Sequence, residues 1–550
     1  MKKLSLLLVF FGILLVYGNA FSQTITSAQP GPWNDINTWV GGSIPDFSNS
    51  ASIIVNHDIT IPTGYTATID ETTINAGSTV TVNTGGGLNI FNPGTDQLLV
   101  NGTLVGSQGS TITGADGTNV RISSTGTYRH AYTTGQGNIP LAIWDDGSLL
   151  NITGYTNFTT ATVAGNWGQD FSNVTWNCTT QTGTLNLGGF LTTIRGDLNV
   201  LSTGTTGVVR FTATTPASIS VGGNFNVSGG TRLTFCTTST CTIDVTGDYT
   251  QNLSAGYVRF ADAGANGIGT LNLTGNFNLQ AGTLTENGGA TARGNINFIG
   301  SAGTVHTFTE AGTPTSVLTN NLAYSVADDN ELNAIGESQI AGGATSFFTL
   351  GTNSILRVAS TDAAGAIQTG TGQSAASGNL RVTNGNRVYN AGSQIIYNGS
   401  SAQFMGTGQP VTAGITTMIN NTARVSQVAG TTIALGGALT LQTGNLTISN
   451  ATLTVSGVTD LQGGDILFTN AGTVRGLTLS GDVNLSGNIS ITSGTVNANI
   501  IFGGEITGGG VISFSGANSN VAINGTSDMV FPLSGPTSLE VLNYNRSGST

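Results

Sequence analysis

The chain has 550 residues, of which only 8% are charged and 81 are glycine, and its formal net charge is −12. With 15 basic residues against 27 acidic ones, it lacks the clustered Lys and Arg that binding to nucleic acid requires. Its apolar residues make up 38% and recur in regular alternation, which excludes a disordered chain and predicts a buried core.

Residues 1–22 have the features of a secretory signal peptide. Lys2-Lys3 supplies the positive start, and the apolar run over residues 4–16 is too short for a stable membrane span. The small-x-small triplet Ala20-Phe21-Ser22 predicts cleavage between Ser22 and Gln23, with cleavage after Ala20 as the alternative. We therefore expect a protein secreted to the cell surface, with no membrane span after the leader is removed.

Residues 23–180 are predicted to form an N-terminal capping and aromatic-rich β section. Trp33 and Trp39 precede the first strand-like runs, at 53–55 and 59–61, where they would seal the end of the core as a cap. A sugar-stacking pair is the alternative interpretation of the same two residues.

Aromatic residues then cluster between positions 128 and 176. Aromatic faces bind sugar rings, so Trp144, Trp167 and Trp176 are candidates for glycan stacking on a shallow strip. The alternative is a wider, irregular cross-section that these bulky side chains fill from within.

Residues 181–550 are predicted to form a β-strand-repeat solenoid. In residues 271–298, short runs alternate apolar and polar residues with period two, which is typical of strands with one buried face. Gly-Asn or Gly-Asp punctuates the runs and indicates a turn, where φ can be positive. This pair begins at residues 196, 223, 247, 275 and 294, so the spacings are 27, 24, 28 and 19. A loose period of this size predicts an all-β, right-handed parallel β-solenoid, or β-helix.

The end of the sequence also reads as strand and turn. Val541-Leu542-Asn543-Tyr544-Asn545 resembles a fresh strand, and no helix, aromatic plug or charge cluster follows it. We expect further coils and a sorting domain beyond residue 550, because an uncapped solenoid exposes unpaired backbone groups.

Cys236 and Cys241 are candidates for a disulfide, since their spacing suits a small closed turn between two strands and export permits the bond. Free buried thiols are the alternative. Cys178 would then be left without a partner cysteine, and we expect it in the core. Two thiols without a nearby histidine do not make a metal site.

The residues that could support catalysis are few. His57, His130 and His306 lie far apart in sequence, and each is expected to be structural or exposed. The pairs Asp145-Asp146 and Asp328-Asp329 could bind calcium or act as acid and base if they lie in loops, although we expect ordinary solvated turns. We therefore predict no catalytic residue, no cofactor and no metal site.

Four stretches of the chain resemble one family of exported proteins. They are the opening Trp33, Thr38-Trp39, Gly41-Gly42 and Pro45; residues 139–148; residues 171–178 leading to Arg195-Gly196-Asp197; and residues 391–404. In style they resemble secreted, adhesin-like β-strand-repeat surface proteins of bacteria that use type IX secretion. That resemblance implies an exported adhesin-like or matrix protein without assigned catalytic residues.

The sequence thus favours a cell-surface or matrix structural protein that adheres through a long Thr/Asn-rich β face. Its expected partners are glycans or surface proteins. The alternative is a carbohydrate-active enzyme, such as a polysaccharide lyase or hydrolase, built on a parallel β-helix. Convergence of carboxylates or histidines from successive coils in one groove would favour the enzyme.

Overall fold

The structure is a computed structural model of the chain. It describes residues 23–91, 94–262, 264, 266–289, 291–312, 315–374, 378–449, 451–469, 475–494, 498–516, 519–524 and 539–544. The predicted signal peptide, 1–22, and the last residues, 545–550, lie outside the described residues, and Gln23 is already part of the first strand.

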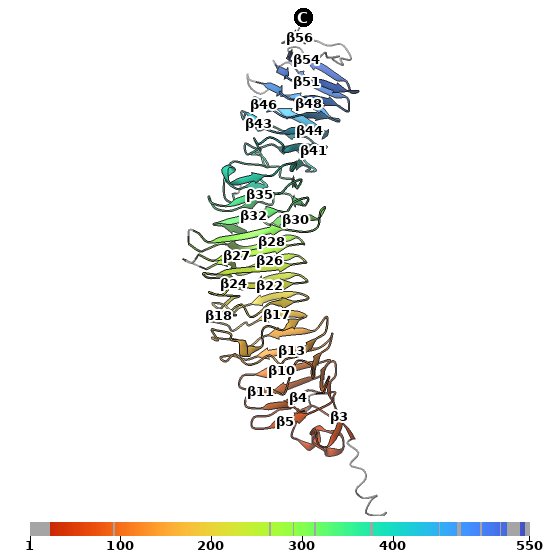
Figure 1. The fold of residues 1–550 in the computed structure, drawn as a ribbon, viewed down its shortest axis with the longest axis vertical. Helices are drawn as coiled ribbons and strands as arrows, with labels where there is room; N and C mark the ends of the chain where they lie inside the picture. Colours follow the sequence, from red (N-terminus) through yellow and green to blue (C-terminus); the bar gives the residue numbers. More distant parts are fainter. Residues whose placement is uncertain are drawn as a thin grey trace, which may run out of the picture. The chain divides into compact units, whose positions relative to one another are not determined.

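The fold is a parallel β-solenoid, which confirms the predicted fold class. Among the described residues, the named strands pair in parallel (Figure 1). The helical elements in the same residues are short 3-10 turns. Two compact units, 1–209 and 210–550, make up the chain. The sequence placed the start of the repeat section at residue 181. No helix among the described residues is long and apolar enough to cross a membrane.

In unit 1 the strands stack as successive rungs of separate walls. The first wall contains β1 (Gln23–Thr26), β3 (Ser50–Val55), β6 (Thr72–Ile74), β9 (Leu98–Val100), β12 (Val120–Ile122) and β14 (Ile143–Trp144). The second contains β2 (Gly31–Pro32), β4 (Ile59–Ile61), β7 (Thr79–Val82), β10 (Thr103–Ser107), β13 (Thr127–Ala131), β15 (Leu149–Ile152), β17 (Asn173–Asn177) and β20 (Leu198–Ser202). The remaining elements are β5 (Thr66–Ile69), β8 (Gly87–Ile90), β11 (Thr111–Thr113), β16 (Asp170–Phe171), β18 (Thr184–Asn186), β19 (Thr193–Ile194), η1 (Ile36–Thr38), η2 (Val40–Gly42) and η3 (Val163–Gly165), and β21 (Val208–Arg210) lies at the boundary.

Unit 2 repeats this arrangement. One wall contains β22 (Ala217–Val221), β25 (Thr240–Val245), β27 (Ile268–Leu273), β29 (Arg293–Phe298), β32 (Leu322–Val326), β35 (Phe347–Leu350) and β38 (Arg387–Tyr389). A second contains β23 (Phe225–Gly229), β24 (Arg232–Cys236), β26 (Tyr249–Ala261), β28 (Phe277–Thr285), β30 (Val305–Glu310), β31 (Ser316–Thr319), β33 (Glu331–Ala334), β36 (Ile355–Val358), β39 (Gln394–Tyr397), β41 (Thr416–Asn420), β44 (Ala438–Thr443), β47 (Thr459–Leu461), β50 (Val483–Leu485) and β53 (Ile506–Gly508).

The later coils of unit 2 add two further walls. They are β40 (Gln403–Phe404), β42 (Val425–Ser426), β45 (Asn445–Ile448), β48 (Asp465–Phe468), β51 (Ile489–Gly494) and β54 (Ile512–Gly516), and then β43 (Ile433–Leu435), β46 (Thr452–Val455), β49 (Gly476–Leu479), β52 (Ala498–Phe502), β55 (Ser519–Ile523) and β56 (Leu539–Tyr544). A short pair, β34 (Ile340–Ala341) and β37 (Leu380–Arg381), and the turn η4 (Asn384–Asn386) complete the unit.

The coil length follows from the register of the strands. In unit 1 a coil contains about 24 residues, since the partners on successive strands are Val80, Leu104, Tyr128 and Leu150. In the coils from β25 to β32 of unit 2 a coil contains about 27 residues, since the partners there are Ile243, Leu271, Ile296 and Tyr324. The later coils are shorter, at about 22 residues, since the partners there are Leu439, Thr459, Val483 and Ile506. The side chains of Ile243, Leu271, Ile296 and Tyr324 point inward, and all four are buried. Period-two alternation therefore puts one face of each strand in a continuous core, as the sequence predicted.

The Gly-Asn and Gly-Asp pairs mark the corners between coils, but the glycines serve close approach rather than positive φ. Gly275 is absent from the residues with positive φ, and a Cβ added to it would overlap the Gly247 carbonyl oxygen of the preceding coil. The residue after each glycine then bonds across coils: Asp248 Oδ1 accepts from the backbone N–H of Asn276 at 2.7 Å. Only glycine leaves room for this contact.

One of the five predicted copies is not at a corner. Gly294-Asn295 lies inside β29, where Gly294 is the partner of Gly269 and not of Gly275. The position that follows Gly275-Asn276 by one coil is His306-Thr307, since Phe277 and Phe308 are partners. The shortest spacing, 19 residues, therefore joins a corner pair to a pair inside a strand, which share residue types but not a structural position.

Trp33 and Trp39 lie near the start of unit 1 and are buried, as expected of a cap. Their ring centroids are 4.9 Å apart in an edge-to-face arrangement. Trp39 Nε1 donates to the Trp33 carbonyl oxygen at 2.8 Å, and Trp33 Nε1 donates to that of Pro45 at 3.2 Å. Neither ring is open to a sugar, so the stacking alternative for this pair has no structural support.

Candidate functional site

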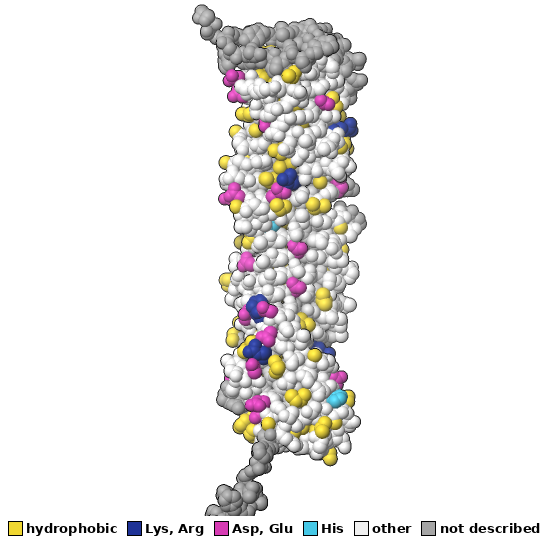
Figure 2. All heavy atoms as spheres, turned by 90° about the vertical axis from the view of Figure 1, so that its right-hand side faces the viewer, with side chains coloured by type: hydrophobic (Ala, Val, Ile, Leu, Met, Phe, Trp, Pro, Cys, Tyr) yellow, Lys and Arg dark blue, Asp and Glu magenta, His cyan; other side chains and the backbone are white. Residues whose placement is uncertain are grey.

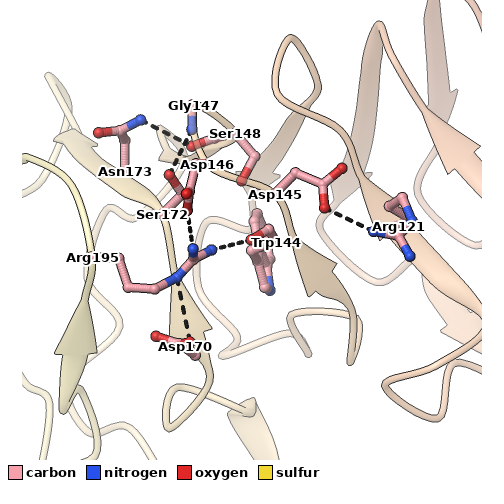
Figure 3. A network of polar contacts seen from close by, with 10 residues as sticks. All are labelled: Arg121, Trp144, Asp145, Asp146, Gly147, Ser148, Asp170, Ser172, Asn173 and Arg195. Atoms are coloured by element: carbon pink, nitrogen blue, oxygen red, sulfur yellow. Dashed lines mark hydrogen bonds and ion pairs between the residues drawn. The ribbon is translucent and has the colours of Figure 1, made fainter.

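A shallow polar hollow of about 400 Å³ lies on unit 1, where the turn after β14 meets the next two coils (Figure 3). The turn runs from Asp145 to Ser148, and it closes through a hydrogen bond from the Ser148 N–H to the Asp145 carbonyl oxygen at 2.9 Å. Gly147 takes a φ of 98°, which a side chain would disfavour. The hollow is lined by Ala142, Ile143, Trp144, Asp145, Asp146, Asp170 and Arg195.

Arg195 lies at the centre of this hollow, between carboxylates from two other coils. Its guanidinium forms an ion pair with Asp146, lies 3.3 Å from Asp170, and donates to the Trp144 carbonyl oxygen (Figure 3). The carboxylates remain open to water, because the Asp146 side chain is 85% exposed and that of Asp170 is 65% exposed. Solvent therefore weakens these pairs, which position the side chains more than they stabilise the fold.

A second arginine continues the same line of charges. Arg121 Nε lies 2.9 Å from Asp96, and its Nη1 lies 2.8 Å from Asp145. The hydrogen bond with Asp96, aided by that with Asp145, raises the pKa of Arg121. We call the six residues Asp96, Arg121, Asp145, Asp146, Asp170 and Arg195 the ion ladder. Four carboxylates against two guanidiniums leave it with a charge of 2 − 4 = −2.

Most of this ladder was not predicted from the sequence, although its spacing carries a signal. One member follows another at a nearly constant spacing that equals the coil period of this unit: Asp96, Arg121, Asp145, Asp170 and Arg195. A single charged residue per coil at a fixed phase must gather along one edge. Asp145 and Asp146 were considered as a pair, yet they bond to different arginines.

The predicted glycan-stacking tryptophans are in the core, which corrects that hypothesis. Trp144, Trp167 and Trp176 are 4%, 1% and 3% exposed, so no sugar ring can lie on them. Trp176 stacks with Tyr155 at 5.7 Å and with Trp167 at 6.3 Å between ring centroids. The alternative interpretation holds: the rings fill the interior of these coils.

Each of the three histidines has a local partner, and the structure does not bring them together. His57 is half-buried, and its Nδ1 lies 2.9 Å from Ser27 Oγ. His130 is fully buried on β13, with Nε2 2.9 Å from Tyr155 Oη and 2.8 Å from the Gln136 carbonyl oxygen. Burial lowers the pKa of His130 to about 4, so its ring is neutral at pH 7.

His306, on β30, is also fully buried. Its Nδ1 lies 2.8 Å from the Gly275 carbonyl oxygen, and its Nε2 lies 3.2 Å from Asn330 Oδ1. The second acid pair is likewise occupied by structural bonds: Asp328 Oδ1 accepts from the Thr352 N–H at 2.7 Å, and Asp329 Oδ1 accepts from Asn353 Nδ2 at 3.1 Å. Among the described residues, no three His, Cys, Asp or Glu side chains form a group that could hold a metal.

All three cysteines are free, buried thiols in the structure, so the proposed Cys236–Cys241 disulfide is not formed in it. Cys236 Sγ instead donates to the Phe260 carbonyl oxygen at 3.2 Å. Burial raises the pKa of Cys236 and of Cys178 to about 12, and it raises that of Cys241 as well. A thiol with so little thiolate at neutral pH oxidises slowly.

The outward face of one wall of unit 2 is mostly polar and carries few charges. Alternate residues of β22, β25, β27, β29, β32 and β35 point outward, and we call their polar side chains the polar face: Ser218, Ser220, Thr240, Thr242, Asp244, Thr270, Asn272, Asn295, Asn297, Ser325 and Thr349. Strand geometry spaces them about 4.8 Å between coils and about 6.7 Å along a strand. Four other outward residues interrupt the array: Ile268, Arg293, Ala323 and Phe347.

Side-chain hydrogen bonds join one column of this face, which we call the face ladder. Asn272 Nδ2 donates to Asp244 Oδ1 at 2.6 Å, and Asn297 Nδ2 donates to Asn272 Oδ1 at 2.8 Å. Ser325 Oγ then donates to Asn297 Oδ1 at 2.7 Å. Each amide is held at both ends, so little side-chain entropy remains to be lost when a ligand binds. Figure 2 shows how sparse charged side chains are over the side of the molecule that it displays.

No protein-family model matches the chain, and no curated protein matches it.

Proposed function

We propose that this chain is an exported structural and adhesive protein of the cell surface or extracellular matrix, and that it adheres through the polar face of unit 2. The observation that carries this proposal is the face ladder, in which side chains from successive coils are fixed in one line. A regular array of fixed polar groups suits a partner that also repeats, and a neutral polysaccharide is such a partner.

Many weak contacts, rather than a deep pocket, supply the affinity in this proposal. The outward residues are exposed or half-exposed Thr, Ser and Asn side chains, which offer both donors and acceptors to sugar hydroxyls. Each such bond contributes about 0.5–1.5 kcal/mol, so stable adhesion needs several coils to bind the same chain. A solenoid provides them by repetition.

Binding to immobilised neutral glycans, measured on a glycan array with the purified chain, tests the proposal. The double variant Asn272→Ala with Asn297→Ala removes two members of the face ladder, and its affinity should fall about tenfold. Thr250→Ala with Asn278→Ala is the matched control, because these half-exposed residues are partners on β26 and β28 of the other wall. Equal losses in the two double variants would contradict the proposed surface.

Export is tested separately, by sequencing the N-terminus of the secreted chain. We expect Gln23 as the first residue, and Phe21 would indicate the alternative cleavage after Ala20. Retention of residues 1–22 in the mature chain would contradict the proposed export route.

A carbohydrate-active enzyme is the second candidate, favoured by one observation: Asp146 and Asp170, from successive coils, converge on Arg195 in an open hollow. Both carboxylates already bind the arginine, so neither is a free acid or base in this arrangement. Depolymerisation of a polysaccharide by the purified chain, abolished by Asp146→Asn or Asp170→Asn, would establish this activity. Turnover that persists in both variants would reject the hollow as an active site, and so would the absence of turnover by the unmodified chain.

A further inference from the structure

A second wall of unit 2 carries a cluster of positive charge that the polar face lacks. β24 and β26 are paired in parallel, with Arg232 opposite Tyr257 and Thr234 opposite Arg259. Leu233 and Val258, between these residues, are fully buried, so the arginines and the tyrosine point outward. We call Arg210, Arg232, Tyr257, Arg259 and Asp262 the arginine patch.

Two guanidiniums of the patch share a single carboxylate. Arg210 forms an ion pair with Asp262, and Arg259 Nη1 lies 3.5 Å from the other oxygen of the same side chain. No other carboxylate of the described residues pairs with either guanidinium. Asp262 can neutralise only one of the two, which leaves a net positive charge. In the ion ladder of unit 1 the ratio is reversed, since each arginine there binds two aspartates.

The arginines are held firmly, and part of each remains in contact with solvent. The Arg259 guanidinium lies over the Tyr257 ring, 3.6 Å from its centroid. The side chains of Arg210 and Arg259 are 19% and 24% exposed, and the Nε of each is buried without an acceptor among the described residues. Their terminal nitrogens thus face outward with donors in excess of the acceptors beside them.

A planar, fixed guanidinium pair of this kind matches an anion with two oxygens. Carboxylates and sulfate esters accept two parallel N–H bonds from arginine, and the arginine is pre-organised for them. A nucleic acid does not fit, because binding it needs Lys and Arg clustered along several phosphates, and the chain has only 15 basic residues against 27 acidic ones. Thr283, the partner of Tyr257 on β28, adds a hydroxyl in the next coil for a sugar ring.

We propose that the arginine patch binds an anionic sugar unit of an acidic polysaccharide, through a carboxylate or a sulfate ester. Asp262 occupies the position of the ligand anion and competes with it, so the patch binds its ligand by displacing or sharing that carboxylate. The site lies on a different wall from the polar face and does not depend on it.

Titration of the purified chain with three oligosaccharides tests this site: an oligogalacturonate, a sulfated galactan fragment and an uncharged galactan fragment. The two anionic probes, or one of them, should bind and be weakened by salt, whereas the neutral probe should not bind at the patch. If only one binds, it identifies the anionic group. No saturable binding of either anion up to concentrations on the order of 10 mM would overturn the proposal.

Variants locate the binding. Arg210→Gln with Arg259→Gln should reduce the affinity for the anionic probe at least about tenfold. Arg357→Gln is the control within unit 2, because Arg357 pairs one-to-one with Glu331 at 2.6 Å, and it should leave the affinity unchanged. An equal loss in the control would overturn the assignment of the patch.

Asp262→Asn gives a result that a purely structural role would not. Removing the competing carboxylate should tighten anion binding several-fold, even if the variant unfolds at a lower temperature. Weaker binding in this variant would contradict the proposal. If the unmodified chain binds the anion but no neutral glycan, the proposed function of the polar face is rejected and the arginine patch is not.

Discussion

Asn276 joins three successive coils through one side chain. Its Oδ1 accepts from the N–H and from Oγ1 of Thr307, both at 2.8 Å, and its Nδ2 donates to Asp248 Oδ1 at 2.9 Å. The corner of a coil lacks the regular backbone partner that a strand provides, so the carboxamide supplies the missing acceptor.

Replacing Asn276 with Ala should therefore lower the free energy of unfolding by about 1–3 kcal/mol, because the Thr307 N–H loses its acceptor in a half-buried position. Asn278→Ala, two residues along and pointing outward on β28, should change it by less than about 0.5 kcal/mol. Urea unfolding of the two variants measures the difference. Equal stability of both variants would show that the corner amide is not needed.

His130 gives a prediction about pH. Its pKa is about 4 in the folded chain and about 6.5 when unfolded, so protons bind the unfolded state more tightly between these values. The stability that neutral His130 provides is complete above pH 6.5 and falls by up to about 3 kcal/mol as the pH drops towards 4. His130→Gln should flatten the stability of unit 1 against pH in this window. An unchanged slope in His130→Gln would contradict the burial of a neutral ring.

The thiols give a chemical test of the core. Because Cys178, Cys236 and Cys241 are buried and free, we expect three reactive thiols per chain after denaturation without a reducing agent, and very slow labelling before it. One thiol per denatured chain, in material exported by the cell, would show that Cys236 and Cys241 form the disulfide after all.

Among the elements, an aromatic column runs through the core of unit 2. Phe225, Tyr249, Phe277 and Phe308 are fully buried, and the centroids of successive rings are 5.4, 5.4 and 4.7 Å apart. Each ring packs on the next, so the coils are coupled mainly to their neighbours.

Phe277→Ala should lower the free energy of unfolding by about 3–5 kcal/mol and leave a cavity between β26 and β30. Hydrogen exchange should then accelerate in β26, β28 and β30 and stay unchanged in β47 and β50, several coils away. Phe347→Ala, a half-buried ring on the outer face of β35, is the control and should have a smaller effect. Uniform acceleration throughout unit 2 would contradict nearest-neighbour coupling.

The strands and their period could be predicted from the sequence, because alternation depends on local chemistry alone. The position of each outward side chain could not, because it depends on register between coils of unequal length. Gly294-Asn295 has the same two residue types as a corner pair yet lies within a strand. Trp144 is of a residue type that often binds sugars, yet its side chain is buried in the core. The ion ladder shows that charged residues at the coil period could have been found from spacing.

For the whole molecule, the composition and the proposed adhesion fit together. A chain with 8% charged residues and almost no lysine offers few long-range attractions, so recognition has to come from short-range contacts repeated over many coils. The two exceptions, the ion ladder and the arginine patch, lie in different units and have opposite net charge. The ladder should repel acidic glycans that the patch attracts.

The most direct test of the proposed adhesion is protection of the polar face by a bound polysaccharide. Thr270→Cys places a thiol on β27 within that face, and Thr250→Cys places a matched thiol on β26 of the other wall. Both positions are half-exposed, and the natural cysteines are buried, so a thiol reagent reports on the new residue. We predict that the neutral polysaccharide bound most strongly on the array slows labelling at position 270 and not at position 250. Equal protection at both positions, or protection at 250 alone, would contradict the account.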